Sequence, residues 1–295
     1  MKNKSLIKRL IVIGILISVL VLIPIGYGFG FFKHFVFLFD KDFRNIYGIT
    51  CENTNIYSQR VASIEVEEDA IVVTLRLNFP TYAFTDYDAS ADNFYSAINI
   101  YKELSKQYAD KRIWVSTGTI GSSYPDCIID DGCIEMAWST GAANSECSIS
   151  FYDALRQIML TDNIHTITYE SWIMTDYYQL DTIAKELPIN NSVTFLKGHS
   201  GYTDNFSAIT SFKGLKELDL SFVGDNNIVS DLSFLNELPE LENLTITADS
   251  MRIDFSDVSH NAVKSFTLHT DESSQEFESK LSDAFPNAEI SVVCK

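Results

Sequence analysis

The sequence is short of positive charge. Only 22 lysines and arginines stand against 40 aspartates and glutamates among 295 residues. Four of the basic residues precede position 10, so the formal charge of −18 for the whole chain becomes −22 for the remainder. No basic cluster follows them, and such an acidic surface repels nucleic acids and anionic lipids. The composition therefore excludes nucleic-acid binding. It favours cationic partners or divalent metal ions, and the simpler interpretation is solubility alone.

Cysteine is scarce, and its spacing lacks the pattern of a zinc site. The cysteines form no C-x-x-C pair and no Cys/His cluster with metal-ligand spacing. In an oxidising compartment they are able to pair, and the three at positions 127, 133 and 147 are close enough in sequence for a local bridge. An odd count leaves at least one thiol free, and the connectivity stays open. The five residues are Cys51, Cys127, Cys133, Cys147 and Cys294.

A run of 23 residues without charge, residues 10–32, lies near the start of the chain. As a helix it reaches about 34 Å, enough to cross a hydrocarbon core of about 30 Å. Lys2, Lys4, Lys8 and Arg9 precede it, and no acidic residue appears before Asp40. The positive-inside tendency predicts a single-pass protein of the cell membrane, with residues 1–9 cytoplasmic, an anchor at 10–32 and the rest extracytoplasmic. A cleaved signal peptide is the alternative.

The middle of the chain predicts a small α+β domain, residues 61–154, after a connector at 33–60. Alternating apolar residues predict strands at 61–66, 71–77, 113–119, 133–138 and 147–151. A helix begins at Ser90 or Asp92 and buries an apolar face that runs from Phe94 to Tyr108. We expect this domain to cap the segment that follows, because a stacked array needs an end that covers its exposed core.

Residues 155–295 contain six short segments with one pattern: apolar, two spacers, apolar, spacer, apolar. The segments start at Ile164, Asn190, Leu215, Leu241, Val263 and Phe285, with steps of 26, 25, 26, 22 and 22 residues. Steps of this size are typical of stacked repeats. The last two apolar positions are Ile167/Tyr169, Val193/Phe195, Leu218/Leu220, Leu244/Ile246, Phe266/Leu268 and Ala288/Ile290. Because alternate residues of a strand face one side, these side chains are predicted to share one core. Short helices are predicted at 177–187 and 277–285.

At these residues the chain resembles the leucine-rich repeat, whose core reads L-x-x-L-x-L followed two residues later by Asn or Cys. Leu215, Leu218 and Leu220 match best, and Leu241, Leu244 and Ile246 follow closely. The usual asparagine is replaced in every unit, by Trp172, Gly198, Val223, Asp249, Asp271 and Val293. The resemblance implies an irregular array of parallel strands and short helices, as in anchored proteins of bacterial surfaces. The expected fold class is therefore α/β: a transmembrane helix, a small α+β domain and a leucine-rich-repeat-like array.

In that family the strands line a concave face that binds other proteins, so the resemblance implies a non-catalytic, membrane-anchored binding protein without a cofactor. The polar positions that alternate with the apolar ones are the candidate partner-binding residues. They are Thr166, Thr168, Ser192, Thr194, Glu217, Asp219, Asn243, Thr245, Ser265 and Thr267. An ordinary α/β layer whose faces bind nothing is the alternative.

Three other hypotheses remain. Gly198-His-Ser-Gly-Tyr202 is similar to the G-x-S-x-G nucleophile elbow, which would make Ser200 the nucleophile of an extracytoplasmic hydrolase, although Tyr202 replaces the last glycine. A structural envelope protein that self-associates through its sheet edge or its aromatic end is the second. Asp86, Asp88, Ser90 and Asp92 alternate as in a calcium loop, but Ala91 and Ala97 stand where an EF-hand needs Gly and Glu. Calcium is therefore only an alternative ligand, because acidic residues at a helix start also suit its dipole.

Overall fold

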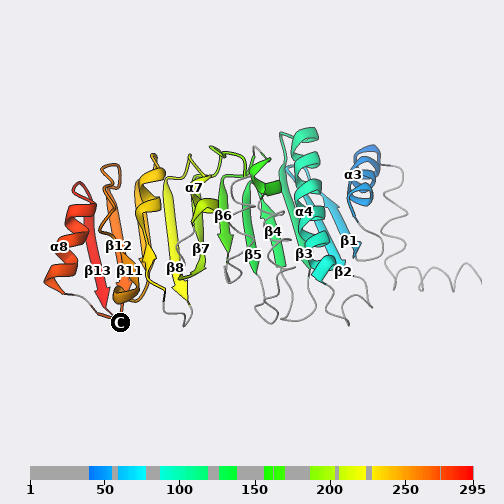
Figure 1. Ribbon diagram of the computed structural model, residues 1–295. Helices are drawn as coiled ribbons and strands as arrows, with labels where there is room; N and C mark the ends of the chain where they lie inside the picture. Colours follow the sequence, from blue (N-terminus) through cyan, green and yellow to red (C-terminus); the bar gives the residue numbers. More distant parts are fainter. Residues whose placement is uncertain are drawn as a thin grey trace, which may run out of the picture. The chain divides into compact units, whose positions relative to one another are not determined.

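The computed structural model describes residues 40–54, 59–77, 87–118, 126–137, 156–161, 163–169, 187–202, 206–223, 228–272 and 274–294 (Figure 1). The chain divides into two compact units, Met1–Ile49 and Thr50–Lys295. Among the described helices none is both long and apolar enough to cross a bilayer, and the predicted anchor at 10–32 lies outside the described residues.

Most of helix α3 (Lys41–Glu52) belongs to the first unit. This segment was expected to be part of a connector, and its helix was not predicted. Asp40 caps the helix, since its Oδ1 accepts the backbone N–H groups of Asp42 at 2.8 Å and Phe43 at 3.2 Å. Phe43, Ile46 and Ile49 recur at three-residue spacing and are buried. This apolar pattern is short and lies among polar residues, so the sequence alone did not indicate a helix.

The second unit is a mixed α/β structure built on a large, mostly parallel sheet. In the described residues eleven strands form this sheet in the order β1-β2-β3-β4-β5-β6-β7-β8-β10-β12-β13. Pairing is antiparallel at β1–β2, β3–β4 and β4–β5, and parallel at every other step. The strands are β1 (Gln59–Val66), β2 (Ala70–Leu77), β3 (Arg112–Gly118), β4 (Asp126–Asp130), β5 (Cys133–Ala137), β6 (Thr166–Tyr169), β7 (Phe195–Gly201), β8 (Glu217–Val223), β10 (Asn243–Thr247), β12 (Ser265–Thr270) and β13 (Glu289–Cys294).

Helix α4 (Tyr87–Gln107) connects the parallel strands β2 and β3, and it packs against β2, β3 and β4. Its residues Ala97, Ile98, Tyr101 and Leu104 are buried, which confirms the central part of the predicted apolar face, whereas Tyr108 is half-buried and follows the helix. The predicted start at Ser90 or Asp92 was wrong, because the helix begins at Tyr87. Strands were correctly predicted near 61–66, 71–77, 113–119 and 133–138. Strand β4 was missed, and the strand predicted at 147–151 lies outside the described residues.

One apolar side chain from each strand forms a continuous row across the sheet. The strand registers align these residues side by side, and the first ten are each no more than 7% exposed. We call this set the apolar row. Its members are Ile64, Val73, Val115, Ile129, Ile134, Ile167, Leu196, Leu218, Leu244, Phe266 and Ile290. Fully burying one such side chain contributes about 1.5–3 kcal/mol, so the row is a major source of stability. It runs through the predicted boundary at residue 154, where β5 pairs with β6.

A repeated backbone junction sets the start of each parallel strand. The carbonyl of Thr194 accepts the N–H groups of Lys216 at 2.8 Å and Glu217 at 3.0 Å. The carbonyls of His165, Lys216 and Glu242 each accept, in the same way, the N–H groups of the first residue of the next strand and of the residue before it. These junction residues are 29, 22, 26 and 22 positions apart along the series 165, 194, 216, 242 and 264.

The register of β8, β10 and β12 is as predicted, but the registers of two neighbouring strands were wrong. In β7, Leu196 and Gly198 lie beside Leu218 and Leu220, where Val193 and Phe195 were expected. In β13, Ile290 and Val292 occupy the positions predicted for Ala288 and Ile290. Both errors arise because several apolar residues in each segment fit the two-residue alternation equally well.

The segments that return from one strand to the next hold short helices and a second, two-stranded sheet. Phe255 contacts Phe266, Phe277 and Phe285 edge to face, which packs the last return segments onto the apolar row. The helix predicted at 277–285 is confirmed as α8, whereas the one at 177–187 lies largely outside the described residues. These elements are α7 (Ser207–Thr210), β9 (Ser230–Asp231), η2 (Ser233–Glu237), η3 (Ser250–Arg252), β11 (Ile253–Asp254) and α8 (Gln275–Ala284).

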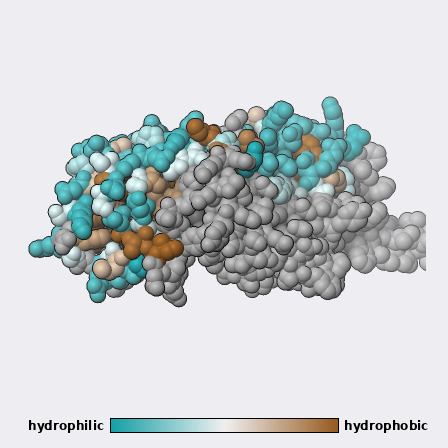
Figure 2. All heavy atoms as spheres, viewed as in Figure 1, coloured by the Kyte–Doolittle hydropathy of each residue, from teal (hydrophilic) through white to brown (hydrophobic). Residues whose placement is uncertain are grey.

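The surface over these last elements is mainly hydrophilic, with small apolar clusters (Figure 2). The structure describes four cysteines, Cys51, Cys127, Cys133 and Cys294, and no two of these four form a disulfide with each other. A bridge between Cys127 and Cys133 does not form, because β4 and β5 place them opposite Met136 and Asp130 instead.

The side chain of Asn190 joins the segment before β6 to the segment before β7. It is 4% exposed, and its Nδ2 donates to the carbonyl of Met159 at 3.2 Å. Its Oδ1 accepts the backbone N–H groups of Ser192 at 2.9 Å and Val193 at 2.8 Å. Three backbone groups therefore depend on one side chain that was predicted only as the start of a repeat.

We predict that Asn190→Ala lowers the free energy of unfolding by about 2–3 kcal/mol, because those backbone groups lose their partner in a buried setting. Denaturant unfolding of the full chain measures the change. The neighbouring Asn191 is exposed, so Asn191→Ala is the control and should stay within about 0.5 kcal/mol of the parent chain. Equal stability of the parent and Asn190→Ala would contradict the role given to this residue.

Candidate binding face of the parallel strands

The side of the sheet opposite the apolar row is lined by polar side chains from the parallel strands. Each of these residues is exposed or half-buried, and none is fully buried. Because every strand has alternating sides, the register that buries the apolar row also fixes these residues in cross-strand rows. We call the set the strand face. It comprises Thr166, Thr168, Lys197, His199, Glu217, Asp219, Ser221, Asn243, Thr245, Thr247, Ser265, Thr267 and His269.

Eight of the ten predicted partner-binding residues lie on the strand face. Six of them form two three-residue rows, which are Glu217, Asn243 and Ser265 in one and Asp219, Thr245 and Thr267 in the next. The other two, Thr166 and Thr168, belong to β6, whose neighbours in β7 are Phe195 and Lys197. Phe195 is half-buried and interrupts the polar row.

Ser192 and Thr194 do not belong to the strand face, so this part of the prediction was wrong. Both precede β7. The N–H of Ser192 is bound by Asn190, and the Oγ1 of Thr194 donates to the carbonyl of His165 at 3.3 Å. Their positions are set by the junction between the two strands. Phe195 and Lys197 occupy the places beside Glu217 and Asp219 that Ser192 and Thr194 were expected to fill.

Lys197 and Asp219 form an ion pair across neighbouring strands. Lys197 Nζ lies 2.9 Å from Asp219 Oδ2, and this hydrogen bond is the main reason that the pKa of Lys197 is raised. The side chains remain 54% and 24% exposed, so solvent screens the pair. Glu217, one step along β8, makes no ion pair within the described residues. Among the described residues, the strand face therefore has one carboxylate without an ion-pair partner, Glu217, next to a paired one, Asp219.

A third row of the strand face was missed by sequence reasoning. His199, Ser221, Thr247 and His269 are successive neighbours on β7, β8, β10 and β12. His199 Nδ1 is buried and has no hydrogen-bond partner among the described residues. This row was detectable in the sequence, because a polar residue directly follows each apolar pair of β8, β10 and β12. Only the polar residues before and within each pair were considered.

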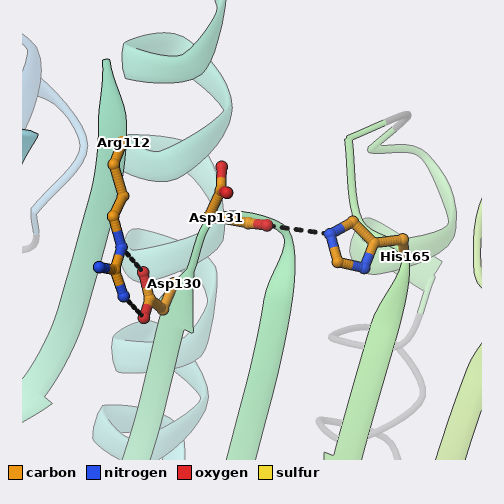
Figure 3. Close-up of polar contacts among 4 residues, drawn as sticks. All are labelled: Arg112, Asp130, Asp131 and His165. Atoms are coloured by element: carbon orange, nitrogen blue, oxygen red, sulfur yellow. Dashed lines mark hydrogen bonds and ion pairs between the residues drawn. The ribbon is translucent and has the colours of Figure 1, made fainter. Parts of the chain in front are cut away.

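The β4–β5 hairpin brings a second group of polar residues together (Figure 3). Asp131 and Gly132 form the two-residue turn, with φ of 48° and 83°. These positive values suit the Asp-Gly dipeptide. On one side of the turn Arg112 Nε donates to Asp130 Oδ1 at 2.7 Å, and Arg112 Nη2 pairs with Asp130 Oδ2. This bidentate contact raises the pKa of Arg112.

On the other side the turn joins the first parallel strand of the array. The carbonyl of Gly132 accepts the N–H groups of His165 at 3.0 Å and Thr166 at 3.3 Å. The ring Nε2 of His165 lies 3.0 Å from the carbonyl oxygen of Asp131. The pKa of Tyr101, which lies close to this turn, is raised mainly by burial. These contacts are structural, because they hold the antiparallel strands to the parallel ones.

We predict that Gly132→Ala lowers the free energy of unfolding by at least about 2 kcal/mol. An added Cβ would overlap the carbonyl oxygen of Asn163 and lie 2.7 Å from His165 Cδ2, in addition to the strain of a positive φ. Gly48 lies inside α3 with no atom within 4 Å of such a Cβ, so Gly48→Ala is the control. It should raise stability by about 0.5–1 kcal/mol. Thermal and denaturant unfolding would refute this account if Gly132→Ala proved as stable as the parent.

The other predicted sites fall as follows. Strand β7 continues to Gly201, so Ser200 lies within a strand beside Phe222, whereas a nucleophile elbow requires a turn from strand to helix. Asp88, Ser90 and Asp92 lie within α4, and Asp86 lies outside the described residues. Among the described residues, no three acidic, histidine or cysteine side chains group as metal ligands.

Comparisons of this chain with protein-family models, with curated proteins and with solved structures gave no match. The fold and the strand face therefore define the class of structure, a mixed α/β unit with a large, mostly parallel sheet.

Proposed function

We propose that this chain is a non-catalytic binding protein that recognises another protein through the strand face. The observation that carries the proposal is the set of parallel polar rows over the buried apolar row. The leucine-rich-repeat resemblance of Leu215–Leu220 and Leu241–Ile246 points the same way, as does the parallel stacking of those strands. We further propose that residues 10–32 anchor the protein in the cell membrane with the array outside.

The chemistry of the strand face suits a polar protein surface. Neighbouring strands are about 4.8 Å apart, so hydroxyl and amide groups recur at a fixed spacing. Each hydroxyl both donates and accepts hydrogen bonds. Strands β8, β10 and β12 are each hydrogen-bonded to a neighbouring strand on both sides. Because their backbone is already fixed, little conformational freedom is lost when a partner binds.

Charge adds a preference to this surface. Glu217, beside the Lys197–Asp219 pair, has no ion-pair partner in the part of the chain that the structure describes, and the whole chain carries a formal charge of −18. A partner that presents Lys or Arg to Glu217 would be attracted at long range and oriented at contact. We therefore expect a protein with a basic contact region. No contact in the described residues favours the Ser200 hydrolase.

We predict that a photoreactive residue at Thr245 or Thr267 gives the same crosslinked partner in cells of the source organism, whereas one at the exposed Glu240, outside the strand face, does not. The partner is then purified and its affinity for the full chain measured by calorimetry. A variant with Glu217→Ala, Asn243→Ala, Thr245→Ala and Thr267→Ala should bind at least about tenfold more weakly.

The matched control also replaces one acidic and three neutral residues, all exposed and elsewhere: Asn191→Ala, Glu240→Ala, Ser259→Ala and Asn261→Ala. It should bind within about twofold of the parent chain. If both variants keep parental affinity while remaining folded by circular dichroism, the strand face is not the binding site.

A further inference from the structure

Strand β13 is the last strand of the sheet, and only one of its edges is paired. It hydrogen-bonds to β12, and no other described strand lies beside it (Figure 1). Its exposed residues include Val293, at 41%, and Cys294. Natural sheets usually protect such an edge with proline, a bulge or central charge. The strand, Glu-Ile-Ser-Val-Val-Cys, has its single charge at one end.

The direction of its backbone groups shows which residues face outward. The N–H of Glu289 donates to the carbonyl of Lys264, on the β12 side, at 2.9 Å. Because N–H and C=O groups alternate between the two edges of a strand, those of Ser291 and Val293 also point to β12. The groups of Ile290, Val292 and Cys294 point to the open edge, where further strand pairing would satisfy them.

The apolar row also ends incompletely at this strand. Leu244 and Phe266 are no more than 2% exposed, whereas Ile290, the next member, is half-buried. The parallel row of Ile246 and Leu268 ends in the same way at Val292. Another strand beside β13 would cover both side chains. The same strand would also satisfy the backbone groups at the open edge.

The sequence of β13 is complementary to itself in one antiparallel register. When Val292 lies opposite its own copy, Ile290 lies opposite Cys294 of the second chain. This register opposes outward-facing residues only, as hydrogen-bonded antiparallel pairs require. It also places Ser291 opposite Val293 of the second chain, at the closely spaced non-hydrogen-bonded positions.

We propose that β13 pairs antiparallel with β13 of a second copy of this chain, which forms a two-fold dimer with one continuous sheet. A two-fold axis makes the interface isologous, so each favourable contact occurs twice. The parallel row of Ile246, Leu268 and Val292 then runs from one protomer into the other, and Val292 meets Val292 at the axis. The strand face of each protomer stays open, and this inference therefore does not depend on the proposed function.

Sedimentation equilibrium of the full chain in density-matched detergent tests the proposal. The parent chain should show a monomer–dimer equilibrium at concentrations up to about 100 μM. Val292→Pro removes an outward N–H that β12 does not use, and proline is tolerated at such an edge position. It should weaken dimerisation by at least about tenfold, whereas Val292→Ala, which keeps the N–H, should weaken it less.

A parent chain that stays monomeric throughout, or a dimer that is as stable in Val292→Pro as in the parent chain, would overturn the proposal.

Discussion

The apolar row is the constraint on which the rest of this structure depends. Side chains of a strand alternate with a period of two, so a slip of one residue would move Leu218, Leu244 and Phe266 to the opposite side of the sheet. The row crosses strands that pair both parallel and antiparallel. Burial of one residue per strand therefore fixes the register of the whole sheet, and the strand face is its geometric consequence.

The sequence predicts this register well only where spacing and chemistry agree. In β8, β10 and β12 both members of the predicted apolar pair lie between polar residues, and one alignment fits. Before β7 the sequence Val-Thr-Phe-Leu offers two alignments, and both Val193 and Leu196 are buried. Only the hydrogen bonds that the carbonyl of His165 accepts from the N–H groups of Thr194 and Phe195 decide where β7 begins. Such a tertiary contact has no signature in the local pattern.

The candidate site shows the same division. The hydroxyl and amide positions of the central strands follow from alternation alone. Lys197 could not be placed until β7 was placed, so the ion pair with Asp219 was missed. His199 and His269 share a row because two strands between them keep the register. Sequence reasoning thus finds the residue types of the strand face more easily than its electrostatics.

The β4–β5 turn explains how an antiparallel hairpin and a parallel array share one sheet. The carbonyl of Gly132 accepts the first N–H groups of the β6 segment, just as the carbonyls of Thr194 and Lys216 accept those of β8 and β10. The turn therefore acts as the first junction of the series, although it belongs to a hairpin. Its positive φ and the close approach of Asn163 leave no room for a side chain. Because the hairpin supplies the junction, the antiparallel strands extend the apolar row at this end of the array. At β13 the same row ends half-covered, and this asymmetry makes the last strand the place where the sheet can grow.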